Sequence, residues 1–205
     1  MKNKPNPALK ITVLFMFVIA AGFIVFQTLY HEAPTVPPLE IDRTGLTNQN
    51  GQLFVFGQTN AFTGVMTESY PDGSPKSRSD IADGRLHGKS EGFYTDGQRQ
   101  IEEHFVLGMS EGIRTRWSTN GVKQSEGQIV QGEFHGDYRK WHANGQVAEF
   151  IHFEEGEPHG TAKSWHPSGF LKSRVEMDRG ETVKQETWND GEKREPAPSD
   201  LVPEN

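Results

Sequence analysis

Glycine recurs along this chain at a fixed interval, and this interval constrains the fold more than any other feature. Turn-forming pairs occur at Asn50-Gly51, Asp72-Gly73, Asp96-Gly97, Asn120-Gly121, Asn144-Gly145, Ser168-Gly169 and Asp190-Gly191. The spacings between them are 22, 24, 24, 24, 24 and 22 residues. Two further glycine series, Gly84 to Gly180 and Gly64 to Gly160, keep a spacing of 24. A period of this length indicates a tandem array of one supersecondary unit.

The pattern within each unit is typical of a β-hairpin. Asn-Gly and Asp-Gly pairs tolerate positive φ at both central residues of a type I′ turn. The expected structural turn residues are Gly73, Gly97, Gly121, Gly145, Gly169 and Gly191. Apolar residues alternate with polar ones after the turn, as in Val147, Glu149 and Ile151, which is the period of a strand. The sequence therefore predicts an all-β repeat fold over residues 47–191, an elongated twisted antiparallel sheet of about six hairpins.

Two columns of side chains repeat with the same period. Four residues before the turn glycine stand Ser69, Phe93, Trp117, Trp141 and Trp165, and eight residues after it stand Ile81, Phe105, Ile129, Phe153 and Met177. The first column supplies the candidate binding residues Phe93, Trp117, Trp141 and Trp165, because an exposed aromatic row can stack on sugar rings or anchor a protein interface. The same row can instead pack against the apolar column and hold the hairpins in register. The sequence leaves both interpretations open.

The N-terminal segment 11–30 is almost wholly apolar and follows Lys2, Lys4 and Lys10. It is long enough to span a bilayer as a helix. We expect a transmembrane signal anchor at 11–30, a cytoplasmic N-terminus at 1–10 and an inner-membrane location with the repeats on the far, periplasmic side. A cleaved signal peptide is the alternative. Residues 31–46 are expected to form a Pro-rich stalk, and residues 192–205 a disordered tail.

Composition and spacing exclude several kinds of function. The formal net charge is −7, which argues against a nucleic-acid partner, and the absence of cysteine excludes disulfides and thiolate metal sites. His87, His135 and His159 share one column, and His142 and His166 another. Equivalent residues of successive two-strand units lie about 10 Å apart, so a column cannot converge on one ion. A pair drawn from two columns, such as His135 with His142, stays open.

Acidic pairs such as Glu102-Glu103 do not suggest hydrolytic chemistry, because neighbouring residues of a strand point to opposite faces. We therefore expect neither an enzyme nor a cofactor.

The units carry a family resemblance. Asn144-Gly145 to Glu155-Gly156, followed by His159-Gly160 and Trp165, resemble the bacterial MORN-variant repeat, and the resemblance covers about residues 47–191. Proteins built of these repeats are often grouped as YwqK-like antitoxin components, which implies binding to a partner protein and no catalytic position. The expected function is a membrane-anchored scaffold for protein–protein interaction in the bacterial envelope. The alternatives are an antitoxin or immunity protein, and glycan or peptidoglycan binding through the tryptophan row.

Overall fold

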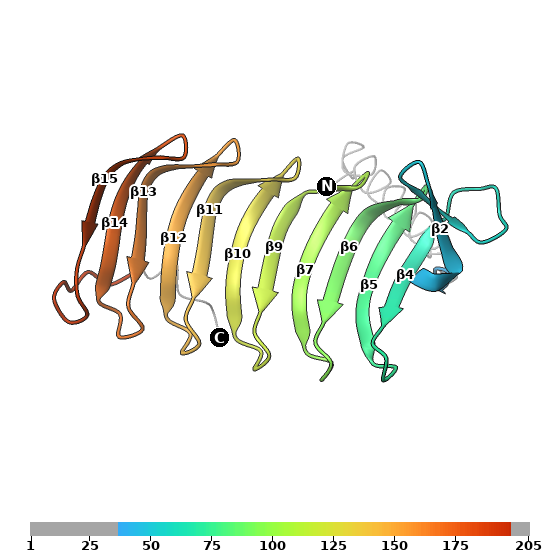
Figure 1. Ribbon diagram of the computed structural model, residues 1–205, viewed down its shortest axis with the longest axis horizontal. Coiled ribbons are helices and arrows are strands. Elements are labelled where there is room, and N and C mark those ends of the chain that lie inside the picture. Colours follow the sequence, from blue (N-terminus) through green and yellow to red (C-terminus); the bar gives the residue numbers. More distant parts are fainter. Residues whose placement is uncertain (1–36, 198–205) are drawn as a thin grey trace, which may run out of the picture. The chain divides into compact units, whose positions relative to one another are not determined.

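The computed structural model describes residues 37–197, which form an all-β fold (Figure 1). In chain order the elements are β1 (Glu40–Asp42), the 3₁₀ turn η1 (Arg43–Gly45), β2 (Leu46–Gln49), β3 (Gln52–Val55), β4 (Gly64–Ser69), β5 (Pro75–Ala82), β6 (Arg85–Phe93), β7 (Arg99–Val106), β8 (Met109–Ser110), β9 (Gly112–Trp117), β10 (Lys123–Val130), β11 (Glu133–Trp141), β12 (Val147–Glu154), β13 (Glu157–Trp165), β14 (Leu171–Asp178) and β15 (Glu181–Thr187).

The strands lie side by side in chain order. A 13-stranded sheet runs β1-β4-β5-β6-β7-β9-β10-β11-β12-β13-β14-β15, with β8 paired to β7. Neighbouring strands from β4 to β15 pair antiparallel, as in β11 and β12, where Tyr138 lies opposite Ile151. At one edge β1 pairs with β4 in parallel, with Ile41 opposite Met66. The strands β2 and β3 form a separate two-stranded sheet.

The expected fold class needs correction. Among residues 37–197, no helix is long and apolar enough to cross a membrane. The expected fold class, a sheet preceded by a transmembrane helix, is therefore corrected to an all-β fold. The segment 11–30, on which that helix was expected, lies outside the described residues. The sheet is also mixed at its β1 edge rather than wholly antiparallel. Asn50-Gly51 closes the separate β2–β3 pair, and no strand follows Asp190-Gly191 within the described residues.

The loops at Gly73, Gly97, Gly121, Gly145 and Gly169 are three-residue loops rather than type I′ turns. At Asp96-Gly97 only the glycine has positive φ, at 82°. The N–H of Gly97 donates to the carbonyl of Tyr94 at 2.9 Å, and the N–H of Tyr94 donates to the carbonyl of Gln98 at 2.8 Å. A turn followed by one left-handed residue is the common three-residue hairpin loop. The carboxylate of Asp96 accepts the N–H of Gln98 at 2.9 Å, which explains the acidic or amide residue before the glycine.

Type I′ turns lie instead at the opposite ends of the strands, where the second glycine series falls. Both central residues have positive φ, for example 52° at Leu107 and 89° at Gly108. The same holds for Asp83-Gly84, Gln131-Gly132, Glu155-Gly156 and Arg179-Gly180. The predicted type I′ geometry is therefore wrong for the loops at Gly73 to Gly191 and correct for Asn50-Gly51, where φ is 52° and 81°.

Hydrogen bonds connect successive repeats at the type I′ turns. At the type I′ turns, the N–H of Gly132 donates to the carbonyl of Ser110 at 2.9 Å, one repeat earlier. The preceding N–H, of Gln131, donates to Glu111 Oε2 at 2.9 Å. Equivalent glycine bonds occur at Gly84, Gly108, Gly156 and Gly180. Each turn is therefore held by the repeat before it.

The two faces of the sheet carry different apolar columns. In β11, Arg139 and Trp141 alternate with Tyr138 and Lys140 and so point to the opposite side. Trp141 belongs to a buried cluster with Val147, Trp165 and Leu171, and we call this side the tryptophan face. The ring of Tyr138 lies 6.0 Å from that of Phe153, and we call this side the phenylalanine face. The tryptophan row therefore does not pack against the second column, whereas the interpretation of the row as core is confirmed for Trp141 and Trp165, which pack with Val147 and Leu171.

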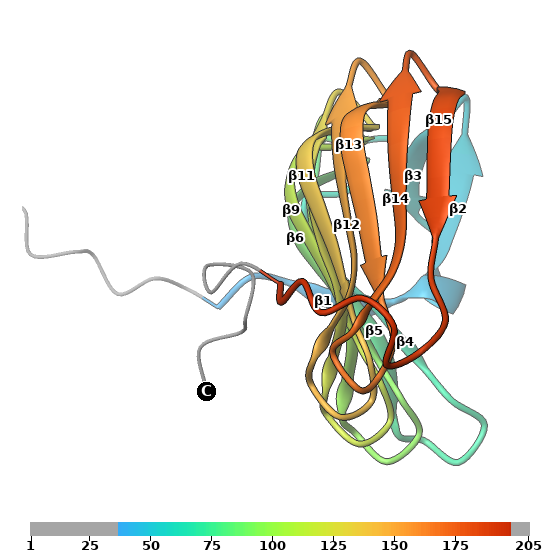
Figure 2. The ribbon, with the colours of Figure 1, turned by 90° about the vertical axis from the view of Figure 1, so that its left-hand side faces the viewer.

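Each face is covered at one end of the sheet. On the phenylalanine face, Leu46 and Leu53 of the β2–β3 pair bury Ile81 together with Phe62. On the tryptophan face, the chain after β15 crosses back over β14 and β13, and Ala197 packs against the buried cluster. Figure 2 shows the β2–β3 pair and this returning segment on opposite sides of the sheet. Residues 192–197, expected to be part of a disordered tail, thus make specific contacts, and the rest of the expected tail lies outside the described residues.

Candidate functional site

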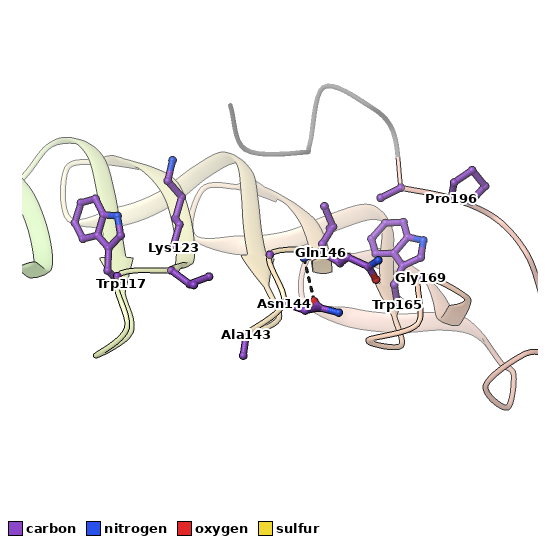
Figure 3. A pocket seen from close by; sticks show the side chains of 13 residues that line it. Trp117, Lys123, Ala143, Asn144, Gln146, Trp165, Gly169 and Pro196 are labelled. Atoms are coloured by element: carbon purple, nitrogen blue, oxygen red, sulfur yellow. Dashed lines mark hydrogen bonds between the residues drawn. The ribbon is translucent and has the colours of Figure 1, made fainter. Parts of the chain in front are cut away.

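An open groove of about 810 Å³ lies on the tryptophan face, beside the three-residue loops (Figure 3). Its apolar surface comes from Trp117, Val122, Val147 and Trp165, and Pro196 and Ala197 of the returning segment line one end of it. Lys123, Asn144 and Gln146 provide polar groups along its length. A long apolar strip with polar edges is suited to a peptide chain rather than to a compact small molecule.

The floor of the groove follows from one position in each repeat. The second residue after the turn glycine packs on the aromatic residue of the next hairpin. Arg99 lies over the ring of Trp117 at 5.4 Å, and Lys123 over the ring of Trp141 at 5.4 Å. At the next position Val147 takes the place of the cation and is buried beside Trp165. The floor therefore changes from cation-covered to apolar along the sheet.

The candidate binding residues differ in accessibility. Trp165 is 2% exposed and Trp141 is 7% exposed, so both belong to the core. Trp117 is half-buried and lines the groove. Phe93 is half-buried and does not line the groove. Within the predicted row, Trp117 is thus the member best placed to touch a ligand.

The loops beside the groove are connected to one another. Asn144 Nδ2 donates to the carbonyl of Pro167 in the next loop at 2.8 Å, and Asn144 Oδ1 accepts the N–H of Gln146 at 3.1 Å. His142 Nε2 donates to the carbonyl of Trp165 at 2.8 Å. These bonds hold the groove edge in a fixed geometry before any ligand arrives.

Ion pairs neutralise the charges near Trp117. Arg99 pairs with Glu91 at 2.9 Å and with Glu102 at 2.8 Å. Lys89 contacts the same two carboxylates, and its hydrogen bond to Glu91 raises the pKa of the ammonium. Because these cations are paired, this end of the face offers little free positive charge to an acidic ligand.

Next to the opposite end of the groove, which Trp165 and Pro196 line, lies a carboxylate site that sequence reasoning missed. Lys163 Nζ lies 2.8 Å from Glu195 Oε1, and Arg174 contacts Oε2 of the same carboxylate. The hydrogen bond from Lys163 lowers the pKa of Glu195 below its usual value. The indole N–H of Trp165 donates to the backbone carbonyl of Glu195 at 2.8 Å. One feature of the sequence could have indicated this site. Lys163 and Arg174 stand at the positions that Thr115 and Glu126 occupy two repeats earlier, so two cations appear together at the last repeat.

The histidine columns make connections between repeats. His142 and the equivalent His166 each hydrogen-bond a backbone carbonyl of the following repeat. His87 Nδ1 accepts the N–H of Leu107 at 3.4 Å. Within residues 37–197, no group of three or more His, Asp or Glu side chains could hold a metal ion. The structure does not bring His135 and His142 into such a group.

Comparison with known protein families agrees with this geometry. The family model of the MORN repeat variant matches residues 86–106 and 134–155, which cover much of β6–β7 and of β11–β12 with the start of the following turn. A comparison with curated proteins gives no match. The matched segments lie in two units of the same repeating hairpin array, so the chain carries MORN-variant repeats.

Proposed function

We propose that the groove on the tryptophan face binds an extended segment of a partner protein. MORN repeats generally bind proteins or membranes and form a non-catalytic repeat family. The observation that carries the proposal is the apolar strip of the groove, in which Trp117 and Val122 are half-buried and accessible and Val147 is buried. It lies open along a groove whose edges are fixed by hydrogen bonds between loops. An aromatic anchor in a rigid apolar groove is the usual centre of a protein interface.

The exposure of the tryptophans favours a protein ligand over a glycan. Stacking on successive sugar rings requires exposed ring faces. Trp141 and Trp165 are 7% and 2% exposed, so they cannot supply a row of such faces. The remaining apolar strip is suited to aliphatic and proline side chains. A neutralising role toward a toxin, which the resemblance implies, is one case of this function and depends on the identity of the partner.

Site-specific photo-crosslinking in cells tests the proposal. A photoreactive residue replaces either Gln146, which is exposed and lines the groove, or Glu155, which is exposed at a type I′ turn. We expect one discrete protein adduct from position 146 and none from position 155. The partner is then identified from the adduct by mass spectrometry.

A charge change separates groove binding from a general surface effect. Val122→Asp places a carboxylate in the apolar strip, whereas Val183→Asp places the same charge on β15, where Val183 is 71% exposed. The adduct from position 146 should disappear with Val122→Asp and persist with Val183→Asp. Equal adducts from positions 146 and 155, or an adduct insensitive to Val122→Asp, would contradict the proposal.

A further inference from the structure

The segment after β15 lies on the tryptophan face in the way that an extended ligand would. Its backbone carbonyls accept hydrogen bonds from the repeat: the N–H of Leu171 donates to Lys193 at 2.9 Å, and the indole of Trp165 donates to Glu195 at 2.8 Å. Alternate carbonyls are therefore bound from the same side, as in an extended peptide. This segment therefore lies on the tryptophan face next to the groove, and its Pro196 and Ala197 form one end of the groove.

The side chain of Glu195 occupies a receptor made from two strands. Lys163 of β13 binds Oε1 at 2.8 Å, and Arg174 of β14 binds Oε2. Their side chains are 29% and 30% exposed, so both cations are partly removed from water. Two cations bound to separate oxygens fix the position of a carboxylate as well as its charge.

This receptor occurs at one position along the array. In the preceding repeat, Arg139 and Phe150 stand in place of Lys163 and Arg174, and Arg139 is already bound by Asp137 at 3.2 Å. Two repeats earlier the equivalent residues are Thr115 and Glu126. A carboxylate is therefore favoured at the last repeat and disfavoured two repeats earlier, which gives a bound peptide a defined register and direction.

The residues that follow Glu195 continue into the groove. Pro196 and Ala197 line it, and Ala197 packs against the buried cluster of Trp141, Val147, Trp165 and Leu171. From there the groove extends past Gln146 and Lys123 to Trp117 (Figure 3). A peptide that begins with a glutamate in the receptor would extend along this strip.

We propose that the groove recognises an extended segment in which a glutamate precedes proline and a small apolar residue, and that residues 192–197 compete with the partner for the receptor end. The inference rests on the proposed binding function of the groove and names its ligand class and its regulation. A tethered segment has an effective concentration on the order of millimolar, so it excludes weak ligands and yields to a longer one. The longer ligand gains the additional contacts with the strip that reaches Trp117.

A labelled peptide with the sequence of residues 191–197 tests the inference on the full-length chain. Its affinity is measured by fluorescence anisotropy for the natural chain, for Glu195→Gln and for Glu186→Gln. Glu186 also contacts Arg174 but lies on β15, so it is the matched control. We expect Glu195→Gln to bind the peptide about tenfold more tightly than the natural chain, because its own segment no longer fills the receptor. Glu186→Gln should bind the peptide like the natural chain.

Two further variants show whether the peptide occupies the receptor. Adding Lys163→Gln to Glu195→Gln should weaken peptide binding about tenfold. Glutamine in place of the peptide glutamate that corresponds to Glu195 should weaken it to the same extent. The inference is overturned if the natural chain and Glu195→Gln bind the peptide with equal affinity. It is also overturned if Lys163→Gln leaves the peptide affinity of Glu195→Gln unchanged. If the peptide does not bind as expected but Val122→Asp still abolishes the crosslink from position 146, the groove binds a partner and the proposed ligand class is wrong. If the peptide binds as expected while that crosslink is absent, the proposed partner function fails instead.

Discussion

The indole N–H of Trp165 donates a hydrogen bond to the backbone carbonyl of Glu195 at 2.8 Å. This bond joins the end of the repeat array to the chain segment that returns across it. Trp165 is 2% exposed, so its polar N–H would be buried without an acceptor if the returning segment were displaced and nothing replaced it. The partner that displaces the segment should therefore supply a carbonyl of its own at this position.

The contact of Glu195 should depend on pH. Lys163, Arg174 and Lys193 surround this carboxylate and lower its pKa below the ordinary value of 4.5. A lowered pKa in the folded state gives stability that is present above 4.5 and is lost as the pH falls through the folded value. Tryptophan fluorescence followed from about pH 6 to about pH 3 should show a transition that Glu195→Gln lacks. Identical curves for the two chains would contradict the ion contact.

His142 connects its repeat to the next one through a hydrogen bond to the carbonyl of Trp165. Tyr94, at the equivalent position, donates its hydroxyl to the carbonyl of Trp117 at 2.8 Å. His142→Tyr should therefore retain the connection, whereas His142→Phe should lower the free energy of unfolding by about 1 kcal/mol. Urea unfolding of both variants measures the difference. Equal stability of the tyrosine and phenylalanine variants would show that the bond contributes nothing.

Gly145 is required for its backbone conformation rather than for space. Its φ is 80°, and no atom lies within 4 Å of the position that a Cβ would take. Gly145→Val should lower the free energy of unfolding by about 1–2 kcal/mol, because a β-branched residue disfavours the left-handed region. Gly145→Asn should cost less, since asparagine adopts this region more readily. Thermal denaturation that ranks the two variants the other way would contradict the loop geometry.

Replacement of Trp141 should mainly lower the stability of the fold. It is 7% exposed and packs with Val147, Trp165 and Leu171, so Trp141→Ala should lower the free energy of unfolding by about 3–5 kcal/mol. Trp117 is half-buried, and Trp117→Ala should cost clearly less. Urea unfolding of the two variants checks this order. A larger loss for Trp117→Ala would contradict the assignment of Trp141 to the core.

Leu107 has an unfavourable conformation for its residue type. Its φ is 52° and it is 58% exposed, so neither backbone preference nor burial favours leucine there. Asn50 has the same φ of 52° in the type I′ turn between β2 and β3. Leu107→Asn should therefore raise the free energy of unfolding by up to about 1 kcal/mol. A fall in the melting temperature would mean that the leucine side chain makes a net stabilising contribution at this turn.

The repeating hairpins could be predicted because glycine marks every change of strand direction. The turn types could not be assigned correctly, because both kinds of loop contain a glycine. The carboxylate of Asp96 accepts the N–H of Gln98, which requires no positive φ at Asp96. The parallel strand Glu40–Asp42 falls in the expected stalk and has no counterpart in the repeat, so the period carried no information about it.

The candidate groove was predictable only in part. Phe93, Trp117, Trp141 and Trp165 occupy one column, but their exposure depends on the residue that packs on each ring and on the returning segment, neither of which repeats. Glu195 meets Lys163 and Arg174 through contacts between distant parts of the chain, which a local pattern cannot reveal. The expected location across a membrane and the neutralising role stay predictions, since residues 11–30 and the partner lie outside what the structure describes.

Amide hydrogen exchange of the chain, with and without the partner identified by crosslinking, tests most directly whether the tryptophan face is the binding surface. We expect slower exchange in the groove loops, at residues 121–123 and 143–147, and faster exchange in residues 192–197 as the segment leaves the receptor. The type I′ turns at residues 107–109 and 131–133 should exchange at the same rate in both states. Protection at those turns with no change in the groove loops would show that the tryptophan face is not the binding surface.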